Sequence, residues 1–176
     1  MPSWGELFRN ATRSAVHLEM RDIYVPDDPV YLDWRAQAKD NPGLPFHDWY
    51  PEERFQRWHD LVKETMARGV WVRRARIVSE PVTDYIRFEY HVATEMNVPA
   101  GEEVRWLPRR RASDLALPGN DFWVFDDRLV RLNHFSGEGD VLEGEVSDDP
   151  AVVKLCASAF ETVWERAIDH AAYRIR

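Results

Sequence analysis

A change of hydrophobic period near residue 70 constrains the fold of this chain more than any other feature. Before it, apolar residues recur at helical spacing; from Val70 the segment VWVRRARIV is short, β-branched and aromatic, which is typical of a strand. Helical and strand patterns then alternate to the end of the chain. The sequence therefore predicts an α/β (α+β) fold, in which N-terminal helices precede a β-α-β-β-β-α sheet domain.

Three helices are expected before this change. The first begins with a capping box at Ser3, and its apolar residues continue at helical offsets as far as Leu18. The second spans residues 29–38, with a proline in its first turn. The third spans residues 51–69, and Gly69 suits the position that follows a helix end.

The pattern of residues 70–176 predicts the sheet and two more helices. Strands are expected at residues 70–78, 104–107, 121–125 and 129–135, and helices at residues 84–95 and from Pro150 onward. Asp126-Asp127-Arg128 joins the last two strands as a hairpin turn. No linker separates the helical region (1–69) from the α/β region (70–176), so the 176 residues are expected to form a single domain.

Charge and cysteine content argue against several classes of function. The formal net charge of −8 disfavours broad attraction to nucleic acid or to an anionic membrane. The single cysteine, Cys156, cannot form an internal disulfide, and the six histidines are scattered, so neither a secreted disulfide scaffold nor a zinc site is expected. The absence of a signal-peptide pattern and of a long apolar run makes the cytoplasm the expected location.

Candidate binding residues gather at the ends of the predicted strands. Ligands of open α/β sheets bind outside the carboxyl ends of strands, and arginine binds carboxylates and phosphates through its planar fork. The expected ligand-binding residues are Glu80, Tyr85, Arg109, Arg111, Asn120, Asp121 and His134, and arginines 73, 74 and 76 are further candidates for an anion pocket. Each feature also has a purely structural interpretation: surface ion pairs, helix capping near residue 84, and a structural histidine.

No complete catalytic or cofactor-binding motif occurs in the sequence. The Walker A, G-x-S-x-G and H-E-x-x-H patterns are missing, and the glycines of residues 137–144 lack the spacing of a dinucleotide site. No cofactor and no metal are therefore expected. Glu80, Asp121 and His134 form an acid–base set only if they converge within hydrogen-bond reach.

Long stretches of the chain resemble an actinobacterial protein family of unknown function that is abundant in streptomycetes. The similar stretches are VRRARIVSEPVTDYIRFEY, EEVRWLPRRRASDLALPGNDFWVFDDRLVRLNHF and DDPAVVKLCASAFETVWERAI, and the resemblance extends from GELFRNATRSAVHLEMRD onward. Genes of that family often lie beside genes for helix-turn-helix regulators and small companion proteins. The resemblance implies a regulatory role and a helix-turn-helix partner, and it assigns no activity.

The hairpin DFWVFDDRLV resembles, more distantly, one half of a phospholipase-D-like domain. The motif of that superfamily is H-x-K, followed five residues later by an aspartate and then by Gly-Ser. The position of Gly-Ser falls near residues 132–134 of this chain. With Asp127 in the place of the aspartate, Asn120 and Phe122 stand where histidine and lysine are needed, so a phosphohistidine intermediate cannot form in the usual way. Degenerate members of the superfamily act as ligand-sensing or interaction domains, and the resemblance therefore implies binding more than catalysis.

Three functions are weighed on these grounds. The first is a non-enzymatic regulatory module that senses a small or anionic ligand or partners a helix-turn-helix regulator. The second is a hydrolase that uses Glu80, Asp121 and His134. The third is a nucleic-acid-facing protein, either a binder through its arginine-rich strand or an acidic mimic through residues 116–176, whose net charge is −6.

Overall fold

The computed structural model describes residues 1–40 and 52–176. Its helices are α1 (Trp4–Asn10), α2 (Pro29–Asp40), α3 (Glu52–Ala67), α4 (Asp84–Val92) and α5 (Pro150–Arg166). Its strands are β1 (Ser14–Glu19), β2 (Trp71–Val78), β3 (Glu103–Pro108), β4 (Asp121–Phe125), β5 (Leu129–Asn133), β6 (Glu145–Ser147) and β7 (Ile168–Asp169). A π-helical turn (Ala93–Asn97) continues α4, and a 3-10 turn (Arg109–Arg111) follows β3. None of the helices formed by these residues has the length and apolar character that crossing a membrane requires.

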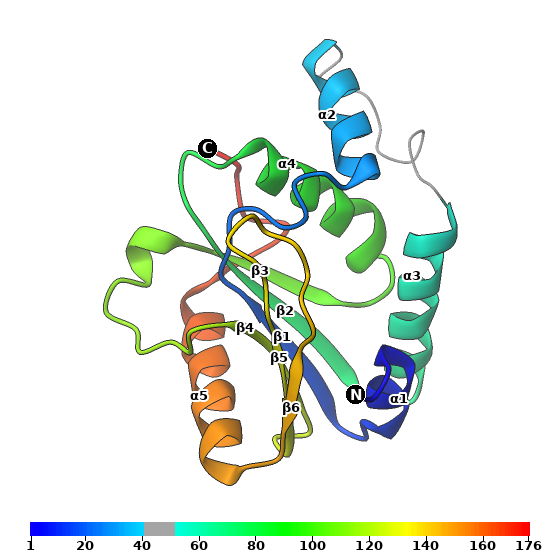
Figure 1. Cartoon of the computed structure of the whole chain (residues 1–176), viewed down its shortest axis with the longest axis vertical. Helices are drawn as coiled ribbons and strands as arrows, with labels where there is room; N and C mark the ends of the chain where they lie inside the picture. Colours follow the sequence, from blue (N-terminus) through cyan, green and yellow to red (C-terminus); the bar gives the residue numbers. More distant parts are fainter. Residues whose placement is uncertain (41–51) are drawn as a thin grey trace.

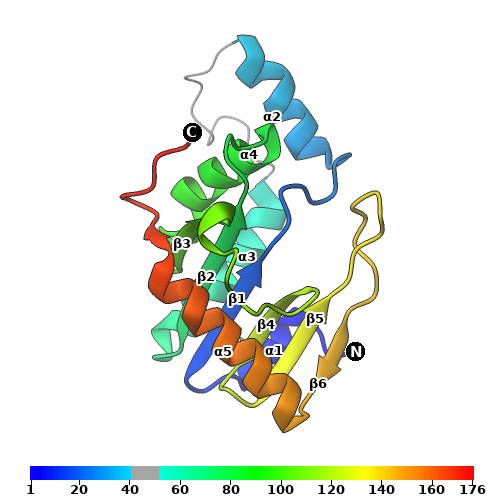
Figure 2. The same ribbon diagram turned by 90° about the vertical axis from the view of Figure 1, so that its left-hand side faces the viewer.

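The strands of the described residues form one mixed sheet in the order β6-β5-β4-β1-β2-β3-β7. β1, β2 and β3 run parallel at its centre, and all other neighbours pair antiparallel. Helix α5 lies over one face of the sheet, whereas α1, α3 and α4 lie on the other side (Figures 1 and 2). The protein is therefore a mixed α+β fold, which confirms the predicted class.

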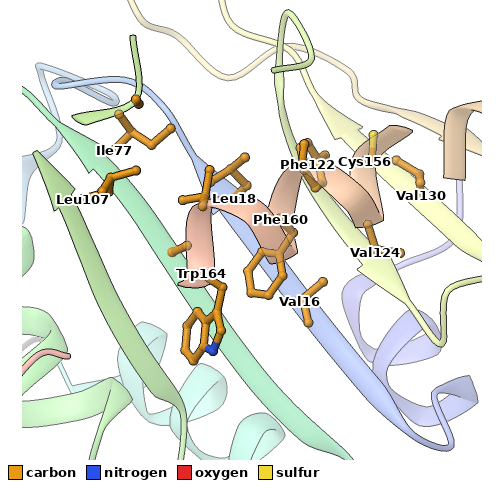
Figure 3. Packing of buried hydrophobic residues seen from close by; sticks show 14 of the residues in the cluster. Val16, Leu18, Ile77, Leu107, Phe122, Val124, Val130, Cys156, Phe160 and Trp164 are labelled. Carbon is orange, nitrogen blue, oxygen red and sulfur yellow. The ribbon is translucent and has the colours of Figure 1, made fainter. Parts of the chain in front are cut away.

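Most of the face covered by α5 is apolar. Alternate residues of the strands point toward this helix because side chains alternate between the two faces of a strand. They include Val16, Leu18, Ile77, Phe122, Val124 and Val130, which surround Cys156, Phe160 and Trp164 of α5 (Figure 3). Cys156 is buried in this cluster, as its place in the apolar stripe of the sequence predicts.

The opposite face begins with an aromatic cluster under α1 and α3. Phe8 of α1 is fully buried, and its ring centroid lies 5.2–5.4 Å from those of Trp58, Trp123 and Phe125 in edge-on arrangements. Such arrangements bring the positive ring edge to the negative ring face, and they pack large areas at a defined distance. The cluster holds α1 and α3 against β4 and leaves the neighbouring part of β1 and β2 to polar residues.

Most predicted elements are confirmed. The capping box at Ser3 is formed, and the expected helices and strands after residue 28 coincide with α2 to α5 and β2 to β5 within a few residues. Asp126 and Asp127 have φ values of 55° and 53°, the left-handed conformation that a type I′ hairpin turn requires at its two central positions. The predicted start of the third helix at residue 51 lies outside the described residues.

The predicted continuation of the first helix to Leu18 is wrong. Helix α1 ends at Asn10, and residues 14–19 form β1, which is the central strand of the sheet. Five of its six residues are buried, so the strand lacks the alternation of apolar and exposed polar residues that marks a surface strand. The spacing of Ala11, Ala15 and Leu18 fits a helix equally well, and only the pairing with β2 and β4 decides between the two.

Two edge strands were not expected. β6 lies in the glycine-rich region and β7 follows α5; they contain three and two residues. Strands this short carry no periodicity that a sequence pattern could reveal. They end the sheet with short edges, which limits pairing with other chains.

Candidate ligand-binding site

Polar and charged side chains occupy the side of β1 and β2 that faces α1, α3 and α4. His17 and Glu19 of β1 and Arg74 and Arg76 of β2 are all buried there. The parallel register places His17 beside Arg74 and Glu19 beside Arg76. Buried charges are costly unless they are paired, so this group needs a specific network of partners.

Arg74 is held by two carboxylates. Its Nε donates to Glu102 Oε1 at 2.7 Å, and one of its terminal nitrogens donates to Glu19 Oε1 at 2.5 Å. The Glu102 side chain is fully buried, and its second oxygen accepts a hydrogen bond from Asn97 Nδ2 at 2.5 Å. The two glutamates raise the pKa of Arg74 against the opposing effect of burial, so the guanidinium stays charged.

Arg76 continues the network toward α4. Its two terminal nitrogens lie 2.6 Å from Glu19 Oε2 and 2.6 Å from Glu89 Oε2. Tyr85, one turn earlier on α4, also hydrogen-bonds to Glu89. Three carboxylates and two guanidinium groups thus form one continuous chain of ion pairs across the sheet.

His17 lies at the edge of this network as a neutral ring. Burial, with the nearby charges of Arg74 and Arg76, holds its pKa well below the usual range. The imidazole stacks on the indole of Trp123 with ring centroids 4.3 Å apart, and its Nε2 lies 3.4 Å from Asn133 Nδ2. A ring that remains neutral cannot act as a proton switch near neutral pH, so its contribution is to shape and hydrogen bonding.

A cavity of about 310 Å³ lies against this network, between the sheet and the helices. This volume is at the lower end of the range for small-molecule sites. It is lined by Trp4, His17, Phe55, Trp58, Arg74, Arg76, Glu89, Val92, Met96, Asn97, Trp123 and Asn133. The lining therefore combines aromatic and apolar walls with a few convergent polar groups, as small-molecule pockets do.

Unsatisfied polar atoms concentrate at this cavity. Trp58 Nε1, Arg76 Nε and Asn97 Oδ1 are buried and have no hydrogen-bond partner among the described residues. All three belong to residues that line the cavity. A fourth such atom, His17 Nδ1, also belongs to a lining residue and lies 3.3 Å from Glu19 Oε1. More than nine in ten buried polar groups in folded proteins are hydrogen-bonded, so three unsatisfied atoms at one cavity require an explanation.

Two of the residues predicted from the sequence, Tyr85 and Asp121, lie beside this network. Tyr85 reaches it through Glu89. Asp121 accepts hydrogen bonds from the hydroxyl of Tyr24 and from the backbone N–H of Met20, and the Tyr24 ring lies 6.0 Å from that of Tyr85. Both therefore support the segment that links β1 to α2 through their contacts with Met20 and Tyr24.

Glu80 and Arg109 lie at the carboxyl ends of β2 and β3, in a separate hollow of about 320 Å³. The guanidinium of Arg109 donates to Ser79 Oγ at 3.0 Å and pairs with Asp22 at 3.1 Å. Glu80 accepts a hydrogen bond from the Tyr173 hydroxyl at 3.2 Å. The polar groups of this hollow are thus already used within the protein.

The other three predicted residues lie apart. Arg111 and Asn120 are exposed and His134 is half-buried. Among the seven predicted residues no hydrogen bond or ion pair joins any two in the part of the chain that the structure describes. Their role in ligand binding stays a prediction, and the structure does not gather them into one site.

Sequence reasoning missed His17, Trp58, Glu89 and Asn97 of the cavity, and Glu19 and Glu102 of the ion-pair network beside it. His17 was assigned to a helical segment that ended at Leu18, and Glu19 to no strand, so their alignment with Arg74 and Arg76 could not be foreseen. The available signal is the i, i+2 spacing of charged residues in both segments, which places each pair on one face of a strand. No group of three or more His, Cys, Asp or Glu side chains suited to a metal ion occurs in the described residues.

Asp121 gives the site a testable pH dependence. Burial raises the pKa of its carboxyl to about 6 from an ordinary value of 3.8, despite the hydrogen bond from Tyr24. Between these values the folded state binds more protons than the unfolded state, so stability falls as the pH rises from about 4 to 6, by about 3 kcal/mol from this group. Asp121→Asn should remove this loss, which urea unfolding at pH 4 to 7 would measure against the exposed control Asp127→Asn. Equal pH slopes for wild type and Asp121→Asn would contradict the assignment.

The chain was compared with curated proteins, with solved structures and with models of protein families. No curated protein matches the chain. Similar solved structures include TrmBL2, described as an archaeal chromatin protein whose structure shows a novel mode of DNA binding (16% identity, TM-score 0.47, 93% of this chain and 48% of that one). Another is Nuc, a phospholipase D family member from Salmonella typhimurium (12% identity, TM-score 0.49, 97% of this chain and 88% of that one).

These likenesses concern the path of the backbone alone and indicate no activity. The chain spans about half the length of the archaeal chromatin protein. A family model described as a domain of unknown function (DUF6879) matches residues 2–175, nearly the full chain. The chain therefore belongs to the DUF6879 family.

Proposed function

We propose that this protein is a non-enzymatic module that binds a small molecule in the cavity between the sheet and helices α1, α3 and α4. The observation that carries the proposal is the concentration of unsatisfied buried polar atoms there: Trp58 Nε1, Arg76 Nε and Asn97 Oδ1. A bound ligand that hydrogen-bonds to them removes the free-energy cost of leaving them without partners.

The state of the charged groups favours binding over catalysis. A general acid or base needs a titratable group that can exchange a proton with the substrate. Glu19 and Glu89 are engaged by guanidinium groups, and the pKa of His17 lies well below neutral pH.

The hydrolase alternative has little geometric support. It requires Glu80, Asp121 and His134 to converge. Glu80 bonds to Tyr173 and Asp121 bonds to Tyr24, and no hydrogen bond links any two of the three within the described residues. The net charge of −8 and the burial of Arg74 and Arg76 also disfavour direct nucleic-acid binding.

A regulatory role extends the proposal. Ligand occupancy would alter the packing of α1 and α3 on the sheet, because Trp4 and Trp58 contribute to both the aromatic cluster and the cavity. A helix-turn-helix partner, as the family resemblance implies, would respond to that change.

Ligand retention tests the proposal. The purified chain is incubated with a small-molecule extract of bacterial cells, recovered by gel filtration and denatured, and the released compounds are identified by mass spectrometry. We expect wild type to retain a compound in near-stoichiometric amount, and Asn97→Leu and Trp58→Phe to retain at least about tenfold less, because each loses a buried hydrogen bond.

A matched control and a competing site sharpen the test. Asn10→Leu makes the same substitution at an exposed position and should retain the compound as wild type does. Retention that survives both cavity variants but is lost in Arg109→Ala would locate the site at the strand ends and refute the cavity. No retained compound in any folded variant would refute the module itself.

A further inference from the structure

Each hydrogen-bonding group that lacks a partner at the cavity can be identified as a donor or an acceptor. Asn97 offers an acceptor. Its side-chain amide donates from Nδ2 to Glu102 Oε2, and an ionised carboxylate can only accept. This contact fixes which end of the amide is oxygen, and so Oδ1 is the end left without a partner. At 2% exposure Asn97 is shielded from bulk water, and its oxygen needs a donor from within the cavity.

Two of the other open groups, on Trp58 and Arg76, are donors. His17 Nδ1 faces Glu19 Oε1 at 3.3 Å and is left aside. The indole Nε1–H of Trp58 can only donate, and so can the Nε–H of Arg76. A ligand that satisfies the cavity therefore offers at least one hydrogen-bond donor, to Asn97, and at least one acceptor, to Trp58 or Arg76. A purely apolar compound would leave all three atoms without partners.

The charges that border the cavity are already balanced against one another. Arg76 pairs with Glu19 and Glu89, and Arg74 pairs with Glu19 and Glu102. The guanidinium of Arg74 also lies 5.9 and 5.7 Å from the ring centroids of Trp58 and Trp123, within the range of cation–π attraction. An anion would face Glu89 and a cation would face both arginines, so a charged ligand would have to compete with existing pairs.

The walls favour a flat ring. Four aromatic residues line the cavity, namely Trp4, Phe55, Trp58 and Trp123, together with Val92 and Met96. The Trp58 ring lies 6.1 Å from Trp4 and 5.7 Å from Trp123, both close to edge-on, so a pocket between such rings offers both ring faces and ring edges. Aromatic ligands gain from offset-stacked and edge-to-face contacts of this kind.

We propose that the cavity binds an uncharged, planar nitrogen heteroaromatic compound that carries both a hydrogen-bond donor and an acceptor on its ring edge. This inference rests on the proposed function, since it names the ligand class of the same cavity. The donor faces Asn97 Oδ1, and the acceptor faces the indole N–H of Trp58.

The indole signals of the tryptophans provide the readout. The 20.7-kDa chain contains eight tryptophans, each with one indole N–H signal in a ¹H–¹⁵N correlation spectrum, and Trp58→Phe identifies the signal of Trp58. Titration with benzimidazole, which is neutral at pH 7.5 and carries one donor and one acceptor, should shift the Trp58 signal saturably. Trp71, which is half-exposed, and Trp164, which lies on the α5 face, should keep their positions.

Two comparisons separate hydrogen bonding from charge. Indene has the same bicyclic frame without the two nitrogens and should bind at least about fivefold more weakly than benzimidazole. Asn97→Leu should weaken benzimidazole about fivefold and leave indene unchanged. Among tryptamine, tryptophol and indole-3-acetate, which are a cation, a neutral compound and an anion of similar size, tryptophol should bind most tightly.

Each outcome decides the inference. If tryptamine or indole-3-acetate binds most tightly and shifts Trp58, the ligand is charged; the inference then fails while the cavity remains a binding site. If indene binds as well as benzimidazole, the donor and acceptor play no part and the inference fails. If no probe shifts Trp58 in wild type, the inference also fails, whereas the retention experiment decides the proposed function separately. The comparisons of benzimidazole with indene and among the three indoles use wild type, so an Asn97→Leu variant that does not fold leaves them intact.

Discussion

Arg74→Met is expected to lower the free energy of unfolding by about 3–5 kcal/mol, because removal of one partner leaves buried carboxylates without a counter-charge. Glu102, whose side chain is fully buried, would keep only the hydrogen bond from Asn97. Glu19 would keep Arg76. Urea unfolding at pH 7, followed by tryptophan fluorescence, measures the change.

Arg73→Met is the matched control for this experiment. Arg73 is the preceding residue of β2 and faces the other side of the sheet, where it pairs at 3.5 Å with Glu103, whose side chain is 51% exposed. Because Glu103 is half-exposed and the surrounding water screens its charge, this pair is expected to contribute about 1 kcal/mol or less. Losses of equal size in the two variants would mean that the buried network does not bear on stability as described. A partial recovery in Arg74→Met/Glu102→Gln would locate the cost at the unpaired carboxylate.

Phe160→Ala is expected to cost about 3–5 kcal/mol of unfolding free energy. Phe160 is completely buried between α5 and the sheet, beside Leu18, Phe122 and Trp164 (Figure 3). The substitution removes the hydrophobic contribution of the ring and leaves a cavity that the surrounding side chains fill only in part. Chemical unfolding monitored by circular dichroism gives the difference directly.

The same helix supplies the control. Leu155 is 51% exposed on the outer side of α5, so Leu155→Ala should change stability by no more than about 0.5 kcal/mol. A small effect of Phe160→Ala, comparable to that of Leu155→Ala, would contradict the packing of α5 on the sheet. A changed dependence on denaturant concentration would indicate that the variant also altered the denatured state.

The candidate site could be anticipated only in part. Arg74 and Arg76 were recognised as candidates because arginine is prominent in anion binding, but their partners were not. Glu19 and Glu102 lie 55 and 28 residues from Arg74 along the chain, and no local pattern joins positions so far apart. The predicted residues at the strand ends, Glu80 and Arg109 among them, do lie at an edge of the sheet, where their polar groups pair within the protein.

Local sequence determined the elements whose signals are complete within a few residues. The apolar stripe and acidic N-cap of α5, the capping box of α1 and the turn between β4 and β5 each depend on neighbouring side chains and backbone geometry alone. These features set the α+β class and the direction of each hairpin and helix.

Tertiary structure decided the identity of β1 and, with it, the site. A central strand buried on both faces has no alternating pattern, so the segment 14–19 satisfies helical spacing until it pairs with β2 and β4. That parallel pairing brings His17 and Glu19 beside Arg74 and Arg76, and the helices that cover them enclose the cavity. The physical reason is that strand pairing and the ion pairs it creates are non-local, whereas periodicity and capping are local properties of the chain.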